Sequence, residues 1–298
     1  MTVEALAGRL SDIGNRCPGC GSSPDFKPLF PISEENDVFF FECTHCGIGT
    51  ANKLPKDDLV LELYEPKNYV SSLTNETSLS KRCAERILPH ISVFDPTGDF
   101  RILDYGGGNG NLSKQLIEML SENYPDLRLT SAVVDLYQRN DDGPISFVTA
   151  DEFLQSSDTY DLVIASAILE HLVDVKTVMD RLIECGNPRA IFYARTPYEV
   201  PISRIIGRSI IRWPRHLHDM GPAYWSHLEE VYDGRFRIVK SRTSLVETSF
   251  ATRPVRTFIA YVMKAPSHLE SFFRGNANKF FWKLVGGWEV IAVLNETT

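Results

Sequence analysis

A glycine-rich stretch at residues 104–111 has the residue types and spacing that most strongly suggest ligand chemistry. Asp104 ends a short apolar strand pattern, and three glycines follow it at alternate positions: Gly106, Gly108 and Gly110. Apolar residues at helical spacing begin at Leu112. A strand, a glycine turn and a helix in this order predict half of a Rossmann-like unit, because glycine lets the backbone turn tightly and lets a ligand approach closely. A dinucleotide fingerprint would have its third glycine where this chain has Asn111.

Acidic residues follow the next two apolar segments. The first segment, 129–136, contains Asp135 near its end, and the second, 145–151, ends in Asp151. A carboxylate at the carboxyl end of the second strand can accept both ribose hydroxyls of an adenosine. A fourth strand pattern ends in Ser166, before the sequence Ala-Ile-Leu-Glu-His-Leu. The order of these acids predicts a nucleoside-binding edge of a sheet.

Four cysteines near the N-terminus form two C-x-x-C pairs: Cys17, Cys20, Cys43 and Cys46. A glycine follows each pair, which suits a turn whose amides face thiolate sulfurs. This pattern predicts a zinc ribbon with tetrahedral Zn²⁺, and four cysteine ligands leave no open position, so the metal would be structural. Two disulfides or a redox pair are the alternatives. They are less favoured because no signal-peptide pattern precedes the cysteines.

The composition is that of a globular enzyme with one large domain and a small one. No apolar run approaches the ~20 residues that a membrane span needs, and we expect a cytoplasmic protein. The net charge of −8 argues against nucleic acid as a partner, because nucleic-acid binding usually needs a basic surface.

Strand and helix patterns alternate from residue 100 to about 196, which predicts an α/β fold with a mostly parallel sheet. We expect a zinc-ribbon module over 1–60 and the α/β domain over 61–298. Helical insertions are expected at about 197–227 and 252–285. The second insertion would wall a substrate pocket or make a contact in a homodimer.

The first insertion carries four arginines, which would share one face of a helix: Arg204, Arg208, Arg212 and Arg215. Three interpretations remain open. The arginines form a solvated basic face, an anion-recognising lid, or an interfacial helix at an anionic membrane. The planar guanidinium favours an anion such as phosphate or carboxylate.

The D-x-G-x-G-x-G spacing, the acids that follow it and the sequence DLVIASAILEHLVD together resemble class I S-adenosylmethionine-dependent methyltransferases. The resemblance includes ubiquinone-biosynthesis O-methyltransferases, and it implies a Rossmann-like, mostly parallel seven-stranded sheet with helices on both faces. With the four-cysteine module, it extends to enzymes of sugar and secondary-metabolite pathways. It implies that Asp104 orients the cofactor ammonium, Asp135 binds the ribose and Asp151 takes the adenine amino group. The cofactor contacts implied in full are Tyr69, Asp104, Gly106, Gly108, Gly110, Asp135, Leu136, Asp151, Phe153 and Ser166.

Methyl transfer is an in-line displacement that depends mainly on alignment, and a hydroxyl or carbon acceptor must also lose a proton. His171, after the fourth strand, and His218, after the first insertion, are the candidate catalytic bases. Some similar enzymes with an EHL-like sequence bind a divalent metal, but Ala167 stands here in place of an acid, which argues against a catalytic metal.

We expect an oxygen or carbon of a small-molecule acceptor to be methylated. An anionic acceptor such as a nucleotide-linked sugar would suit the arginines. The alternatives are an RNA methyltransferase that uses the zinc ribbon for recognition and a non-catalytic scaffold that keeps the fold.

Overall fold

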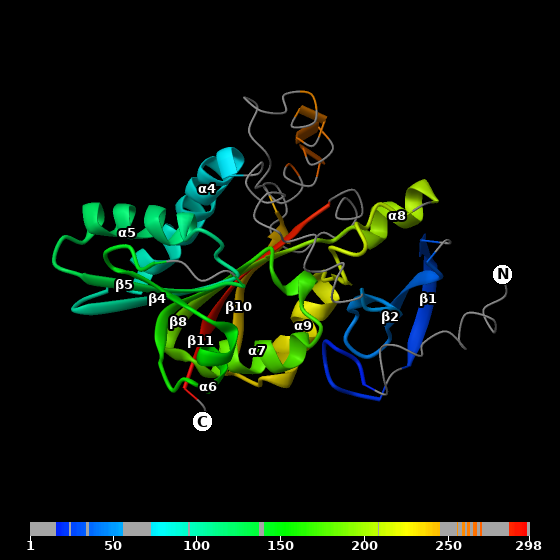
Figure 1. Cartoon of the computed structure of the whole chain (residues 1–298), viewed down its shortest axis with the longest axis horizontal. Coiled ribbons are helices and arrows are strands. Elements are labelled where there is room, and N and C mark those ends of the chain that lie inside the picture. The colour runs from blue at the N-terminus through cyan, green and yellow to red at the C-terminus, as the bar shows by residue number, and fades with distance from the viewer. Residues whose placement is uncertain are drawn as a thin grey trace.

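The computed structural model describes residues 16–23, 25–33, 36–55, 73–94, 96–136, 140–207, 209–244 and 286–296, and isolated positions between 255 and 269. A large α/β layer occupies one end of the molecule, and a small all-β module lies beside it (Figure 1). No helix within the described part of the chain is long and apolar enough to span a membrane.

The large layer is built on the seven-stranded sheet that the sequence predicts. Its spatial order is β10-β11-β8-β7-β4-β5-β6. The strands are β4 (Asp99–Tyr105), β5 (Arg128–Val134), β6 (Ile145–Val148), β7 (Tyr160–Ser166), β8 (Gly186–Thr196), β10 (Phe236–Thr243) and β11 (Trp288–Leu294). All neighbours pair in parallel except β11, which runs antiparallel to β8 and to β10. The carboxyl ends of the parallel strands therefore meet at one edge.

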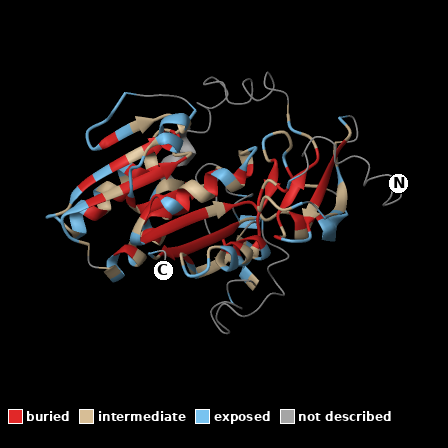
Figure 2. Ribbon diagram, turned by 90° about the horizontal axis from the view of Figure 1, so that it is seen from below, coloured by how far each residue is buried: buried red, intermediate tan, exposed pale blue. Residues whose placement is uncertain are grey.

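Helices cover both faces of this sheet, as predicted (Figure 1). One face carries α4 (Leu73–Ile91) and α5 (Asn111–Asn123), and the other carries α6 (Ala150–Gln155), α7 (Val175–Glu184) and α9 (Pro222–Val231). Central strands are buried from both sides (Figure 2). Alternation along a strand assigns each side chain to one of the two core layers.

Helix α4, which precedes the sheet, contains Pro89 and continues beyond it to Ile91. Proline removes one backbone hydrogen bond near the helix end. Burial of Ile87 and Ile91 against the sheet compensates for that loss.

The small module is a four-stranded antiparallel sheet with the order β1-β2-β3-β9. Its strands are β1 (Phe26–Ser33), β2 (Val38–Cys43), β3 (Gly49–Ala51) and β9 (His218–Asp219). The last strand comes from the first insertion of the large domain, and the Lys176 amide also donates to the Pro18 carbonyl at 2.8 Å. The predicted domain boundary near residue 60 lies outside the described residues, but backbone hydrogen bonds join the two parts.

The first insertion is not one continuous helix, so the predicted shared face of arginines is wrong. Helix α8 (Val200–Ile206) ends at Gly207, whose φ of 69° lies in the left-handed region that favours glycine. Residues 209–216 are not helical. Arg204 forms an ion pair with Glu42 of the small module at 2.5 Å. In the second insertion, residues 255, 258–259, 261–262, 265–266 and 269 are helical, and its other residues lie outside the described part.

Candidate functional site

A cavity of about 200 Å³ opens at the edge where the parallel strands end. Its walls come from the glycine loop after β4, from α4 through Ser80 and Cys83, and from the ends of β7 and β8 through Ser166 and Arg195. Loops that leave neighbouring parallel strands diverge at such an edge, which makes it the usual ligand crevice of an open α/β sheet.

The glycine loop has a shape that larger residues would not permit. Gly106 has a φ of 76°, and a Cβ there would lie 2.4 Å from the side chain of Ile168. A Cβ on Gly107 would lie 2.6 Å from the carboxylate of Asp104. The Gly108 amide donates to Oδ2 of Asp135 at 2.9 Å, which ties the loop to the end of β5.

Asp104 is a buried carboxylate in the cavity wall. It is 2% exposed, and it accepts a hydrogen bond from the Ser113 hydroxyl at 3.1 Å. Burial raises the pKa of Asp104 to about 6, although the Ser113 hydrogen bond works in the opposite direction. The ionised form is therefore costly in the free protein, and a ligand cation would offset that cost.

The residues expected to contact the adenosine of the cofactor differ in how far they are buried. Asp135 is half-buried directly after β5, and Leu136 beside it is 74% exposed. Asp151 is exposed in the first turn of α6, after β6 has already ended at Val148. Phe153 is buried in the core, so its predicted place beside adenine stays a prediction. Tyr69 lies outside the described residues.

Arg195 is a cavity residue that the sequence reasoning missed. It is the next-to-last residue of β8, pairs in register with Ser166 and is half-buried. Burial by itself would lower the pKa of the Arg195 guanidinium. The pKa is nevertheless raised, because electrostatic interactions outweigh burial; the partners are Cys83, Tyr193, Glu170 and Glu289. An arginine that ends the apolar strand run 190–194 was the available indication in the sequence.

The two predicted catalytic histidines differ in their surroundings. His171 is half-buried just after β7, and its Nδ1 donates to the Arg215 carbonyl at 2.5 Å. His218 is 2% exposed, with Nδ1 at 3.0 Å from Thr50 Oγ1 and Nε2 at 2.7 Å from the Leu172 carbonyl oxygen. Burial lowers the pKa of His218 to about 4. Its contacts join the small module to the loop after β7, and a role as base stays a prediction.

His216 is a second residue that the sequence reasoning missed. It brings a ring nitrogen within 4.8 Å of ligand atoms of Glu170 and His171. Glu170 Oε2 and His216 Nδ1 are buried without a hydrogen-bond partner. Three ligand atoms at this spacing could hold a metal even with Ala167 at the position of the missing acid.

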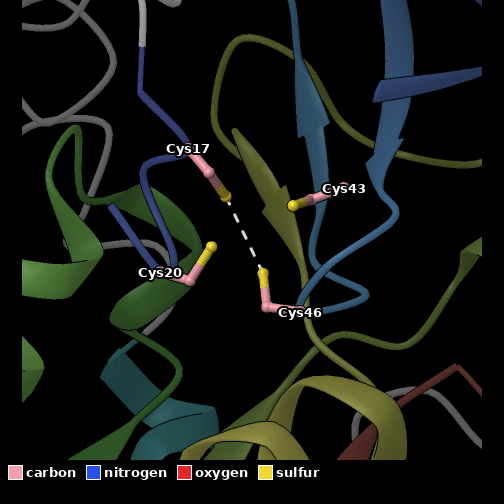
Figure 3. Close-up of side chains that lie close together, drawn as sticks. All are labelled: Cys17, Cys20, Cys43 and Cys46. Atoms are coloured by element: carbon pink, nitrogen blue, oxygen red, sulfur yellow. Dashed lines mark hydrogen bonds between the residues drawn. The ribbon is translucent and has the colours of Figure 1, made fainter. Parts of the chain in front are cut away.

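The four predicted zinc ligands come together in the small module. Their sulfurs point toward a common centre (Figure 3), and the four lie within 4.8 Å of one another. The Cys17 and Cys46 sulfurs are 3.7 Å apart. Tetrahedral coordination at a Zn–S distance of ≈ 2.3 Å would place neighbouring sulfurs about 3.8 Å apart. The cluster therefore fits a four-cysteine zinc site.

A family model and several known proteins match this chain. A family model described as a methyltransferase domain matches residues 58–243. A ubiquinone biosynthesis O-methyltransferase from Rhizobium etli is 25% identical over 134 residues, which are 41% of this chain and 53% of that protein. One from Azorhizobium caulinodans is 27% identical over 132 residues, 41% of this chain and 52% of that protein. The chain thus spans about half the length of the curated relatives it matches.

Solved structures are similar at low identity. The [4+2]-cyclase SpnF has a TM-score of 0.49 at 14% identity, and the match covers 82% of this chain and 98% of the cyclase chain. The N-methyltransferase NodS from Bradyrhizobium japonicum WM9, solved with S-adenosyl-l-homocysteine, has a TM-score of 0.44 at 12% identity, with 80% and 97% covered.

Proposed function

Because the chain belongs to the methyltransferase-domain family, we propose that it transfers a methyl group from S-adenosylmethionine to an oxygen or carbon of a small-molecule acceptor. The observation that carries the proposal is the cavity at the strand ends, where the glycine loop lies between Asp104 and Asp135. Carboxylates on neighbouring strands suit the ammonium and the ribose of the cofactor, and the glycines give it room.

In this proposal the protein contributes mainly alignment, because the sulfonium is already an activated methyl donor and the displacement is in line. The acceptor would enter beside Ser166 and the loop that carries His171. Donation from Nδ1 of His171 to a carbonyl leaves Nε2 as the basic nitrogen. Of the two candidate bases, we therefore favour His171 to take the acceptor proton.

We also propose a structural zinc ion at Cys17, Cys20, Cys43 and Cys46. Zinc there would order the module whose sheet includes β9. Because His218 of β9 binds the carbonyl of Leu172, the zinc module would support the acceptor side of the crevice. The metal would supply no step of the reaction, since four sulfur ligands complete its coordination.

The first test is calorimetric titration with S-adenosylmethionine and S-adenosylhomocysteine. We expect binding by the intact protein and binding weakened by about 3 kcal/mol or more in Asp135→Ala. Absence of binding by the intact protein would favour a scaffold. The acceptor class is tested by methyl-labelled cofactor with pooled nucleotide-linked sugars, small phenolic and carboxylic metabolites, or RNA. Label that appears only in RNA would contradict the small-molecule proposal.

A further inference from the structure

Arg195 extends from the end of β8 into the same cavity that Asp104 lines. Ile191 and Tyr193, on alternate positions of that strand, are buried on the α4–α5 face of the sheet. Because side chains alternate along a strand, Arg195 projects to the same face. Cys83 of α4 lines the cavity there with it. The crevice therefore contains a carboxylate and a guanidinium, both withdrawn from bulk water.

The guanidinium of Arg195 has no hydrogen-bond acceptor within the described residues. Nearby arginines of the same sheet region are paired: Arg86 and Arg242 bind the carboxylate of Glu289 at 2.5 Å and 2.8 Å. The N–H donors of the Arg195 guanidinium are therefore available to an acceptor on a ligand in the cavity. Such an arrangement is expected where a ligand supplies the missing anion.

We propose that Arg195 binds the carboxylate of the methionine end of S-adenosylmethionine, while Asp104 in the same cavity takes the ammonium of that end. The inference rests on the proposed cofactor. An amino-acid zwitterion carries opposite charges on adjacent substituents, and this cavity offers one side chain for each. Guanidinium and carboxylate can form two parallel hydrogen bonds, which fixes orientation as well as charge.

The place of Arg195 favours the cofactor over an anionic group of the acceptor. The other walls of the cavity are the glycine loop, Asp104 and the helix α4. These are the elements that the amino-acid end of the cofactor would contact. An acceptor anion bound by Arg195 would instead leave cofactor affinity unchanged when the arginine is replaced.

The test compares two ligands that differ by the amino-acid end. S-adenosylhomocysteine has it and 5′-methylthioadenosine lacks it, and both are titrated calorimetrically into the full-length protein. For Arg195→Gln we expect S-adenosylhomocysteine affinity to fall about 10- to 100-fold, the effect of losing a charge-assisted hydrogen bond. Affinity for 5′-methylthioadenosine should not change. Arg195→Lys, which keeps the charge without the fork, should fall between wild type and Arg195→Gln.

The matched control is Arg189→Gln. Arg189 lies on the same strand, but it lines a separate cavity at the other end of the sheet, over Phe94. Its replacement should leave both affinities unchanged. The melting temperature of each unliganded variant shows whether a change in affinity reflects loss of the fold rather than loss of a ligand contact.

Three outcomes would overturn the proposal for Arg195. They are an unchanged S-adenosylhomocysteine affinity in Arg195→Gln, an equal loss of affinity for both ligands, and a lower melting temperature without any change in ligand preference. If the wild-type protein binds neither ligand, the proposed function itself fails, and that result is distinct from the other three.

Discussion

Replacement of the buried carboxylate Asp104 by asparagine should make the unliganded protein more stable while it weakens cofactor binding. Burial raises the pKa of Asp104 to about 6 from an ordinary value of 3.8. That difference of about 2.2 units corresponds to about 3 kcal/mol, at about 1.4 kcal/mol per unit. Asparagine keeps an oxygen that can accept the Ser113 hydrogen bond but has no charge to desolvate.

The sign of the pH dependence follows from the raised pKa. The folded protein binds this proton more tightly than the unfolded chain, so the cost of the ionised carboxyl is fully present above about pH 6 and disappears below about pH 4. At pH 8, Asp104→Asn should be up to about 3 kcal/mol more stable than wild type, or roughly 5–10 °C in melting temperature. The difference should close as the pH falls toward 4.

The assay is thermal unfolding from pH 4 to pH 8 without ligand, together with calorimetric titration of S-adenosylhomocysteine over the same range. Wild-type affinity should weaken below about pH 6 as Asp104 takes up a proton, and the variant should bind weakly at every pH. Asp126→Asn, at an exposed position, is the matched control. A variant that melts below wild type at pH 8, or that binds as tightly as wild type, would refute the reasoning.

Four further predictions concern the rest of the site and its support. Asp135→Ala should weaken S-adenosylhomocysteine binding by about 3 kcal/mol or more, the value of two hydrogen bonds to a charged group, and an unchanged calorimetric affinity would contradict its ribose role. Glu289→Gln should destabilise the fold by about 3–5 kcal/mol at pH 7 because it breaks a buried ion pair with Arg86 and Arg242. Burial by itself would raise the pKa of Glu289, but the two arginines outweigh burial and lower it. The stabilisation is therefore lost as the pH falls through the lowered pKa, and the difference in unfolding free energy between variant and wild type, measured with urea, should narrow in acid. His218→Ala should lower the unfolding free energy by about 2–4 kcal/mol through two lost hydrogen bonds and a cavity, whereas lost turnover at unchanged stability would favour a catalytic role. Metal analysis should find zinc in the wild-type protein and lose it in Cys43→Ser, with a lower melting temperature, and a zinc-free wild-type protein of equal stability would exclude the structural metal.

The fold was predictable because its determinants are local and periodic. Buried parallel strands are continuous apolar runs, and the fourth strand pattern, which was expected to end in Ser166, is β7. The glycine loop was predictable because positive φ and close contacts demand glycine at positions such as Gly106. The cysteine pairs were predictable because metal coordination restricts residue type and spacing together.

The first insertion was not predictable in the same way. Its arginines have helical spacing, but Gly207 ends α8 after seven residues, and β9 then pairs with the small module. Strand pairing between residues about 170 positions apart leaves no periodic trace in either segment. The same reason explains why His218, a plausible base by sequence position, binds Thr50 and Leu172 instead.

The α/β class, the strands whose ends form the crevice, and the acids and glycines expected to meet a nucleoside cofactor could all be inferred from the amino-acid sequence. Each of these follows from residue type and short-range spacing. Which distant side chains share the crevice depends instead on how the elements pack in three dimensions. Arg195 enters it from β8 beside α4, and His216 approaches Glu170 and His171. Burial, which raises the pKa of Asp104 and keeps Arg195 from water, depends on everything packed around a side chain, and no local pattern of residues encodes it.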